Sequence, residues 1–251
     1  MCDHGRSFGR CAVAPMQQNA PEVSVVLPIL NESAWIAAAV ASLQAGGADY
    51  EAIIVDGGSD DGTLAILEGL TSDRVRIETI PGPSTRAAAM NRGAAEARAD
   101  LLLFLHGDCR LAPGSLADAR DAVGRGAIGG GFLKRYEPSS PLLALNLLWL
   151  NGIRARLFRC LVGTNAIFCE RRFFKSIAGY PDLPFLEDVL LSDALRRAGR
   201  IAVLRDTVIV SARKYSESGA FARTLRNAEI MFRFRFLGQD PASLLARYRV
   251  G

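Results

Sequence analysis

The sequence has few cysteines, and their arrangement excludes two kinds of small stabilised domain. The chain contains five cysteines, an odd number, and no CxxC pair. A disulfide framework or a structural zinc site is therefore not expected, and a reducing cytoplasm is the simplest compartment. Cys2, His4 and Cys11 lie near one another, but their spacing matches no zinc finger.

The sequence also lacks a long apolar run. Residues 1–20 contain nothing like the apolar core of a signal peptide, so we expect a disordered tail there, with Met16 as an alternative start. The longest apolar stretch, Pro141–Leu150, has half of the ~20 residues that a membrane span requires. We predict a cytoplasmic protein and leave open a peripheral contact with the inner face of the membrane.

Neither sign of charge dominates strongly. The net charge is +4 and the pI is near 8.9. This balance does not indicate a nucleic-acid partner, but it suits a substrate that carries phosphates or loose attraction to an anionic membrane. Hydrophobic residues make up 49% of the chain and neither a repeat nor a long linker interrupts it, so residues 21–251 are predicted to form a single domain.

Strand-like and helix-like segments alternate in the first half of the chain. Val23–Ile29 is a continuous apolar run, typical of a strand that is buried on both faces. We expect strands at Val23–Ile29, Glu51–Val55, Val75–Ile80 and Asp100–Leu105, and helices at Ser33–Gln44, Thr63–Leu70 and from Thr85 to about Arg98. This alternation predicts an α/β fold with a mostly parallel central sheet and helices on both faces.

Polar clusters follow three of these strands. In a parallel sheet, ligands bind beyond the carboxyl ends of the strands, and those ends share one edge. We therefore expect a binding site to form where three clusters converge: Asn31-Glu32, Asp56-Gly57-Gly58 and His106-Gly107-Asp108. Asp60 and Asp61, which follow the second cluster, are interpreted as caps of the next helix.

The second half is less regular. The glycines at 129–131 indicate a strand that passes close to other backbone or to a ligand. We expect helices at Pro141–Leu161, Glu187–Ala198 and Gly219–Leu237, and a strand at Ile201–Val210.

Two apolar segments of this half have more than one interpretation. In the last helix, helical spacing places five residues on one face, namely Phe221, Leu225, Ala228, Phe232 and Phe236. We interpret this face as packed on the core rather than as a membrane anchor. Pro141–Leu150 is interpreted in the same way, as core or as the wall of a pocket.

Four motifs occur in an order that resembles family 2 glycosyltransferases of the GT-A fold. The first is Pro28-Ile29-Leu30-Asn31-Glu32, and the second runs from Val55 to Thr63 (VDGGSDDGT). The third joins RAAAMNRG, from Arg86, to DLLLFLHGD, which ends at Asp108, and the fourth is Leu186-Glu187-Asp188-Val189. The resemblance extends from about Pro21 to the C-terminus, and the motifs together are specific at the level of the superfamily.

The resemblance implies a site for a nucleotide-diphosphate sugar in the first half, residues 21–110. Asp56 would hydrogen-bond the base, while Pro28 and Glu32 would shape the nucleoside pocket. Asp108 would bind Mn²⁺ or Mg²⁺, together with His106, which stands where many members have Asp and supplies no negative charge. The remaining residues assigned to the donor are Asn31, Gly57, Arg86, Asn91, Gly107 and Arg213.

The second half, residues 111–251, would then bind the acceptor. Asp188 would be the base of an inverting transfer, with Glu187 beside it, and Gly163-Thr164-Asn165 would contact a small or lipid-linked acceptor. The element Arg213-Lys214-Tyr215 is not the full processive motif, so non-processive transfer is expected. His106 and these last two elements are also similar to the subgroup named for arsenosugar biosynthesis.

Two other functions remain open from the sequence. A nucleotidyltransferase would require a Gly-rich basic loop after the first strand, where this chain has Pro-Ile-Leu-Asn-Glu. The second alternative is a degenerate glycosyltransferase that serves as a nucleotide-binding scaffold. His106 leaves this alternative open, while Asp108, Glu187 and Asp188 argue against it. A nicotinamide dehydrogenase is excluded because no GxGxxG follows a predicted strand. The donor base, the sugar, the acceptor and the oligomeric state are left open.

Overall fold

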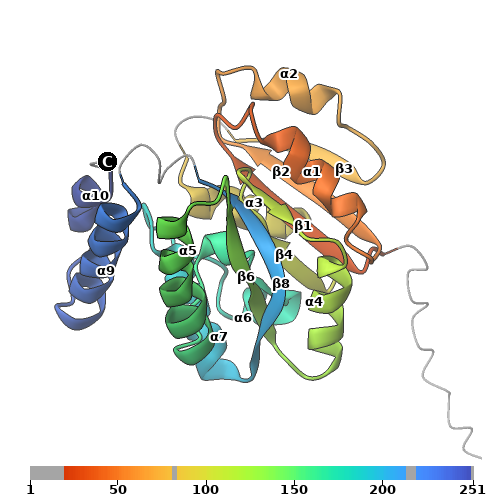
Figure 1. Cartoon of the computed structure of the whole chain (residues 1–251). Helices are drawn as coiled ribbons and strands as arrows, with labels where there is room; N and C mark the ends of the chain where they lie inside the picture. The colour runs from red at the N-terminus through yellow and green to blue at the C-terminus, as the bar shows by residue number, and fades with distance from the viewer. Residues whose placement is uncertain (1–19, 81–83, 213–218, 250–251) are drawn as a thin grey trace, which may run out of the picture.

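A computed structural model describes residues 20–80, 84–212 and 219–249 (Figure 1). The tail predicted at residues 1–20 lies outside the described residues except for Ala20. The segment Arg213-Lys214-Tyr215 lies outside them as well.

The described strands form a single sheet of eight strands in the order β3-β2-β1-β4-β7-β6-β8-β5. Strands β3, β2, β1 and β4 are parallel to one another, and β6 is parallel to β8. Strand β7 is antiparallel to β4 and β6, and β5 is antiparallel to β8. The strands are β1 (Val23–Ile29), β2 (Tyr50–Asp56), β3 (Val75–Thr79), β4 (Leu101–Phe104), β5 (Cys109–Leu111), β6 (Gly129–Glu137), β7 (Phe168–Glu170) and β8 (Ile201–Ser211). The predicted α/β fold with a mostly parallel sheet is confirmed.

Helices lie on both faces of this sheet (Figure 1). They are α1 (Ile36–Gln44), α2 (Thr63–Glu68), α3 (Arg86–Glu96), α4 (Ser115–Gly124), α5 (Pro141–Leu147), α6 (Arg171–Ser176), α7 (Glu187–Ala198), α9 (Ala220–Phe236) and α10 (Pro241–Arg249). A π-helix, η1 (Leu148–Leu157), continues α5, and a single 3₁₀ turn, η2 (Gly163–Asn165), precedes β7. The sequence did not reveal β5, α4, β7, α6 or α10, which are short or carry no distinct periodicity.

The sheet separates two apolar cores. In β1, Val25 and Leu27 pack with α1 and α4 on one face, whereas Val26 packs with α3 and α7 on the other. Strand β1 is therefore buried on both sides, as its continuous apolar run predicts. The registers of β2 and β4 against this central strand determine where the two neighbouring strands end.

The register brings the predicted polar clusters to one edge. Ile29 of β1 pairs with Asp56 of β2, and Val26 pairs with Phe104 of β4. Because these strands are parallel, the loops after all three leave from the same side of the sheet. The predicted convergence of the three clusters is confirmed.

The glycines of β6 allow a close backbone approach. A Cβ atom at Gly130 would lie 2.0 Å from the carbonyl oxygen of Ala202 in β8. Any side chain there would push apart two strands that pair along their whole length. The prediction that this segment passes close to other backbone is confirmed.

The interpretation of the apolar stripe of α9 is wrong, and that of Pro141–Leu150 as core holds only in part. On α9, Leu225, Phe232 and Phe236 are 54, 54 and 74% exposed, and Ile230 faces the core instead. The other segment, Pro141–Leu150, buries Leu143 and Leu150 but leaves most of its large apolar side chains outside. Across the described residues, no helix has the length and apolarity needed to cross a membrane.

A buried carboxylate joins the strands at the opposite, amino-terminal edge of the sheet. Glu51 is 1% exposed and accepts hydrogen bonds from Ser24 Oγ, Arg76 Nη2, and both the backbone N–H and Nε of Arg98. Burial alone would raise the pKa of Glu51, but the bonds from Ser24 and Arg98 outweigh it and hold the pKa below 4.5. The hydrogen bonds of the folded state therefore favour the ionised form of Glu51.

We predict that Glu51→Gln lowers the free energy of unfolding by about 2 kcal/mol, because it leaves buried donors without an acceptor. The folded-state pKa lies below the unfolded one, so the contribution of Glu51 is present above pH 4.5 and is lost as the pH falls through the lower value. Urea unfolding of both proteins at neutral and acidic pH measures this. Glu78→Gln, which disturbs an ion pair with the half-exposed Arg92, should cost no more than about 0.5 kcal/mol. Equal losses in the two variants would contradict the assignment.

Candidate active site

The loops after β1 and β2 are fastened to each other by hydrogen bonds. The backbone N–H of Asn31 donates to Ser59 Oγ over 2.9 Å, and the N–H of Asp60 donates to Asn31 Oδ1 over 3.0 Å. The N–H of Glu32 donates to Thr63 Oγ1 over 2.9 Å. Asn31 has a φ of +56°, a conformation that Asn tolerates better than most residues. The two loops therefore form one wall.

Asp56 shapes this wall from inside. Its side chain is 1% exposed, and its Oδ2 accepts hydrogen bonds from the N–H groups of Gly58 and Ser59. Its Oδ1 accepts from Ser59 Oγ. The structure thus shows Asp56 holding the loop that starts with Gly57, at the edge of the cleft described below.

Asp61 does not cap the following helix. The N-cap of α2 is Gly62, in a left-handed conformation. Asp61 instead accepts hydrogen bonds from Ser33 N and from the N–H and hydroxyl of Thr63, and the Thr63 hydroxyl is the main reason that its pKa is lowered. The expected cap is therefore another link between the two loops.

A cleft opens beside this wall at the carboxyl ends of β1, β2 and β4. Seven of the residues assigned to the donor or the metal line it, namely Pro28, Glu32, Gly57, Arg86, His106, Gly107 and Asp108. Asp108 is almost buried, at 6% exposure. The other side of the cleft is formed by the start of α3, where Thr85 caps the helix through Ala88 N.

Asn91 holds two segments of the chain together rather than lining the cleft. Its side-chain amide donates to the carbonyl of Tyr180 over 2.8 Å and accepts from the N–H of Tyr180 over 2.9 Å. This pair ties α3 to the chain that leads into α7. Asn91 does not line the cleft, and Arg213, the remaining residue assigned to the donor, lies outside the described residues.

The turn Gly163-Thr164-Asn165 joins the two halves of the site. Gly163 N–H donates to Asp188 Oδ2. A Cβ atom at Gly163 would lie 2.2 Å from His106 Nε2, so the imidazole packs directly on the glycine. His106 from the first half and Asp188 from the second half therefore meet across one residue without a side chain.

Asn165 supports this turn from behind. It is fully buried, and its Oδ1 accepts from Val162 N and from Arg154. Its Nδ2 donates to the carbonyl of Phe132 over 2.7 Å. Gly163 and Thr164 are left as the members of the turn that face Asp188 and Lys134.

Lys134 is a site residue that sequence reasoning missed. It is 4% exposed, and its Nζ donates to Thr164 Oγ1 over 2.6 Å. Burial holds the pKa of its ammonium well below the ordinary value; Arg154 lowers it further, while Asp188 and Asp108 oppose that shift. The sequence carries no clear signal for it, because Lys134 stands beside Arg135 just after the glycines at 129–131.

Glu187 and Asp188 begin α7 with different environments. Glu187 is 1% exposed; its Oε1 accepts from Arg86 Nε over 2.6 Å, and its Oε2 has no hydrogen-bond partner among the described residues. Burial raises the pKa of Glu187, the Asp188 carboxylate adds to the rise, and Arg86 opposes it. Asp188 is 8% exposed, and its Oδ1 accepts from Val189 N.

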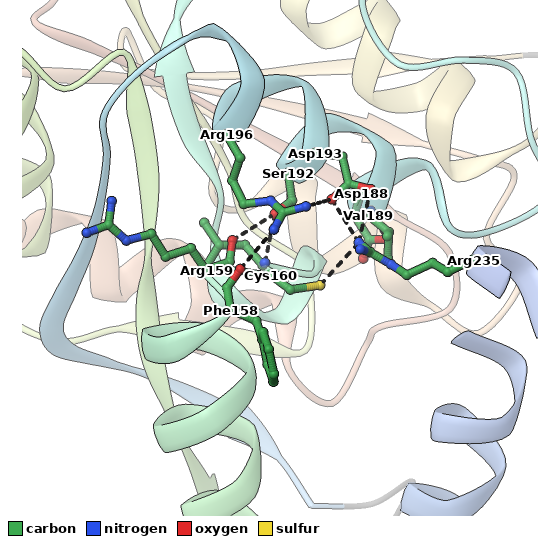
Figure 2. A network of polar contacts seen from close by, with 10 residues as sticks. Phe158, Arg159, Cys160, Asp188, Val189, Ser192, Asp193, Arg196 and Arg235 are labelled. Carbon is green, nitrogen blue, oxygen red and sulfur yellow. Dashed lines mark hydrogen bonds and ion pairs between the residues drawn. The ribbon is translucent and has the colours of Figure 1, made fainter. Parts of the chain in front are cut away.

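A polar network anchors α7 from its other side (Figure 2). Arg196 of α7 donates to the carbonyl of Phe158 and to Asp193. Asp193 also accepts two hydrogen bonds from Arg235 of α9. The helix that carries Glu187 and Asp188 is thereby tied to η1 and to α9.

Comparisons with known proteins identify the family and the fold of the chain. The sequence profile of glycosyl transferase family 2 matches residues 24–173. The chain belongs to glycosyltransferase family 2. It is therefore a glycosyltransferase, and the resemblance to family 2 is confirmed; the fourth motif, Leu186-Glu187-Asp188-Val189, lies outside the matched residues.

Relatives of this glycosyltransferase include the PGL/p-HBAD biosynthesis glycosyltransferase Rv2957 of Mycobacterium tuberculosis (strain ATCC 25618 / H37Rv), with 29% identity over 85% of this chain and 84% of that protein. Among solved structures, S. aureus TarS 1–349 is similar, with a TM-score of 0.62, 17% identity, and coverage of 90% of this chain and 70% of that one. The complex of TarS 1–349 with UDP-GlcNAc has a TM-score of 0.61 and 19% identity, with 76% of this chain and 58% of that one covered. These structures show the GT-A fold for this chain. The resemblance to the arsenosugar subgroup stays a prediction.

We predict that Gly163→Ala lowers kcat of glycosyl transfer by about 100-fold, because the new methyl group displaces His106 and disturbs Asp188. The melting temperature should change little, since the displaced ring borders the open cleft. Gly152→Ala is the matched control: no heavy atom lies within 4 Å of a Cβ at that position, so transfer should stay at the wild-type rate. Wild-type kcat in Gly163→Ala would show that the contact does not matter.

Proposed function

We propose that this glycosyltransferase transfers a sugar from a nucleotide-diphosphate sugar to a hydroxyl group of a small or lipid-linked acceptor, with inversion, with a divalent cation and without processivity. The observation that carries the proposal is the placement of His106 and Asp108 in the cleft, with Asp188 meeting His106 across Gly163. A similar structure, TarS 1–349, binds UDP-GlcNAc, which supports a nucleotide-sugar donor.

In this proposal the nucleotide lies along the wall formed by the loops after β1 and β2. Pro28, Glu32 and Gly57 face the cleft there, and Arg86 lies across from them. Arg86 offers a guanidinium to the diphosphate while its Nε stays with Glu187. Asp56, which is buried behind the cleft, keeps the loop in shape.

The donor set fits a magnesium or manganese ion. The described residues contain no group of three or more His, Cys, Asp or Glu side chains placed to hold a metal. A cation that keeps several waters and takes phosphate oxygens from its substrate needs only one or two carboxylates. Asp108 and His106, both at the cleft, would hold it, and it would supply positive charge to stabilise the departing diphosphate.

Asp188 is proposed as the general base. Its two backbone hydrogen bonds, from Gly163 and Val189, fix the carboxylate while leaving lone pairs for a substrate hydroxyl. The proton of the acceptor hydroxyl passes to Asp188 as the oxygen bonds to the anomeric carbon, and the bond from that carbon to the diphosphate oxygen breaks. Attack from the side opposite to the diphosphate inverts the configuration.

Lys134 and Glu187 complete the proposed site by holding its parts in place. Lys134, which is buried, bonds to Thr164 of the turn beside Asp188. Glu187 holds Arg86 at the diphosphate side through their ion pair. Neither residue needs to touch the reacting atoms.

We predict that Asp108→Ala abolishes the increase in UDP affinity that manganese provides, because the variant removes the carboxylate assigned to the metal. Isothermal titration calorimetry with UDP, with and without manganese, measures the effect. Asp100→Ala is the control, since this fully exposed carboxylate precedes the same strand at its opposite end. If manganese strengthens UDP binding equally in both variants, the metal role of Asp108 is wrong.

We also predict that Asp188→Asn keeps donor binding and lowers transfer by ~10²–10⁴-fold, because the amide cannot accept the proton. Product formation with a panel of UDP-, GDP- and dTDP-sugars measures the loss, and the anomeric configuration of the product tests inversion. Asp121→Asn, at an exposed position on α4, should retain full transfer. Nucleotide binding by the wild type without any transfer or hydrolysis would favour the scaffold function instead.

A further inference from the structure

Two neighbouring helices of the second half present apolar side chains to solvent. On the helix formed by α5 and η1, Leu142, Leu145 and Leu148 are 65–70% exposed. Trp149 is 46% exposed and Leu157 is 71% exposed. Isolated exposed leucines need no explanation, but a row of them along one helix marks an interaction surface.

The exposed side of α9 is fixed by what its other sides bind. Ile230 packs with Phe185, Val189 and Leu244 in a separate small core. Arg235 bonds to Asp193 of α7 (Figure 2). With these sides occupied, Leu225, Phe232 and Phe236 point outward together.

The two helices touch each other, so their exposed sides belong to one region of the surface. The side-chain amide of Asn146 in α5 donates to the hydroxyl of Thr224 in α9. In Figure 1 the blue α9 lies beside the green α5 on the side of the molecule away from α4. We call this region the two-helix face and define it by Leu142, Leu145, Trp149, Leu225, Phe232 and Phe236.

The chemistry around the two-helix face is basic. Helix α9 (Ala220–Phe236) contains four arginines and one acidic residue. Residues 141–159, which include α5 and η1, contain three arginines and no acidic residue. Arg156 and Arg159 are exposed, and Figure 2 shows the Arg159 guanidinium pointing away from the network around Asp193.

Exposed apolar side chains together with basic charge distinguish between two partners that could cover the two-helix face. A second copy of the chain would cover the apolar side chains but would bring two basic surfaces together, with like charges opposed. A bilayer with anionic lipids covers the same side chains and attracts the arginines. Leucine, phenylalanine and tryptophan beside arginine is also the composition of helices that lie in the membrane interface.

We propose that the two-helix face docks this protein on the surface of an anionic bilayer, with α5, η1 and α9 lying in the interface rather than crossing it. The proposal does not depend on the proposed donor, metal or acceptor. It places the part of the candidate site around Lys134 and Asn165 close to the bilayer, because η1 bonds to the backbone of Lys134 through Asn151 and to Asn165 through Arg154.

Flotation of the full chain with lipid vesicles tests the proposal. We expect the protein to float with phosphatidylcholine vesicles that contain about one-third phosphatidylglycerol, to stay at the bottom with pure phosphatidylcholine, and to dissociate as salt rises. Leu145→Glu combined with Phe232→Glu should lower the partition coefficient more than about tenfold, because it places charge in the apolar contact.

Charge variants provide the matched control. Arg156→Glu should lower the partition coefficient at least about fivefold, because each cation near an anionic surface adds roughly that factor. Arg125→Glu makes the same change in net charge at an exposed position that ends α4, and should bind like the wild type. Circular dichroism of each variant verifies folding, and Arg156→Glu carries the test if the double variant unfolds.

Three results would overturn the proposal. The first is a wild-type protein that does not float with anionic vesicles. The second is equal loss in Arg156→Glu and Arg125→Glu, which would show that only net charge matters. The third is a dimer in sedimentation velocity that Leu145→Glu with Phe232→Glu converts to a monomer while vesicle binding is unchanged, which would identify a second copy as the occupant.

Discussion

The contact of His106 with Gly163, beside the hydrogen bond from Gly163 to Asp188, is the constraint on which the candidate site depends. It is where the strand that ends with the Asp108 loop meets the helix that starts with Glu187. Most of the surrounding bonds serve to hold this contact: Asn165 fixes the turn, Arg196 and Arg235 fix α7, and Asn91 fixes the chain before it. A site assembled in this way draws its side chains from two separate parts of the fold, joined at one glycine.

Periodicity located the parallel half of the fold well. The run at Val23–Ile29 coincides with β1, because a strand buried on both faces is apolar at every position and ends where polar loop residues begin. Glu187–Ala198 coincides with α7, because acidic side chains are favoured in the first turn of a helix and therefore mark where it begins. Short elements such as β5 and β7 have no such signal, because three residues cannot show a period.

The hydrogen-bond partners of polar side chains and the solvent-exposed sides of helices could not be predicted from the sequence. Asn91, Asp61 and Asn165 stand at positions typical of binding or capping residues, but their partners come from segments far away in the chain, so local pattern could not reveal them. Lys134 was missed because its burial and its bond to Thr164 arise only in the folded chain. The apolar stripe of α9 was assigned to the wrong environment because spacing shows that a helix has an apolar side, not what that side faces.

The fastened loops after β1 and β2 have a consequence for binding thermodynamics. Their conformational entropy is lost during folding, since Ser59, Asp61 and Thr63 already bond to the neighbouring loop in the free protein. A ligand that settles on this wall meets a preorganised surface and does not have to order it, which leaves more of the interaction energy as affinity. Any induced fit would then arise on the other side of the cleft, and binding of a bare nucleotide should show little of the heat-capacity change that accompanies coupled folding.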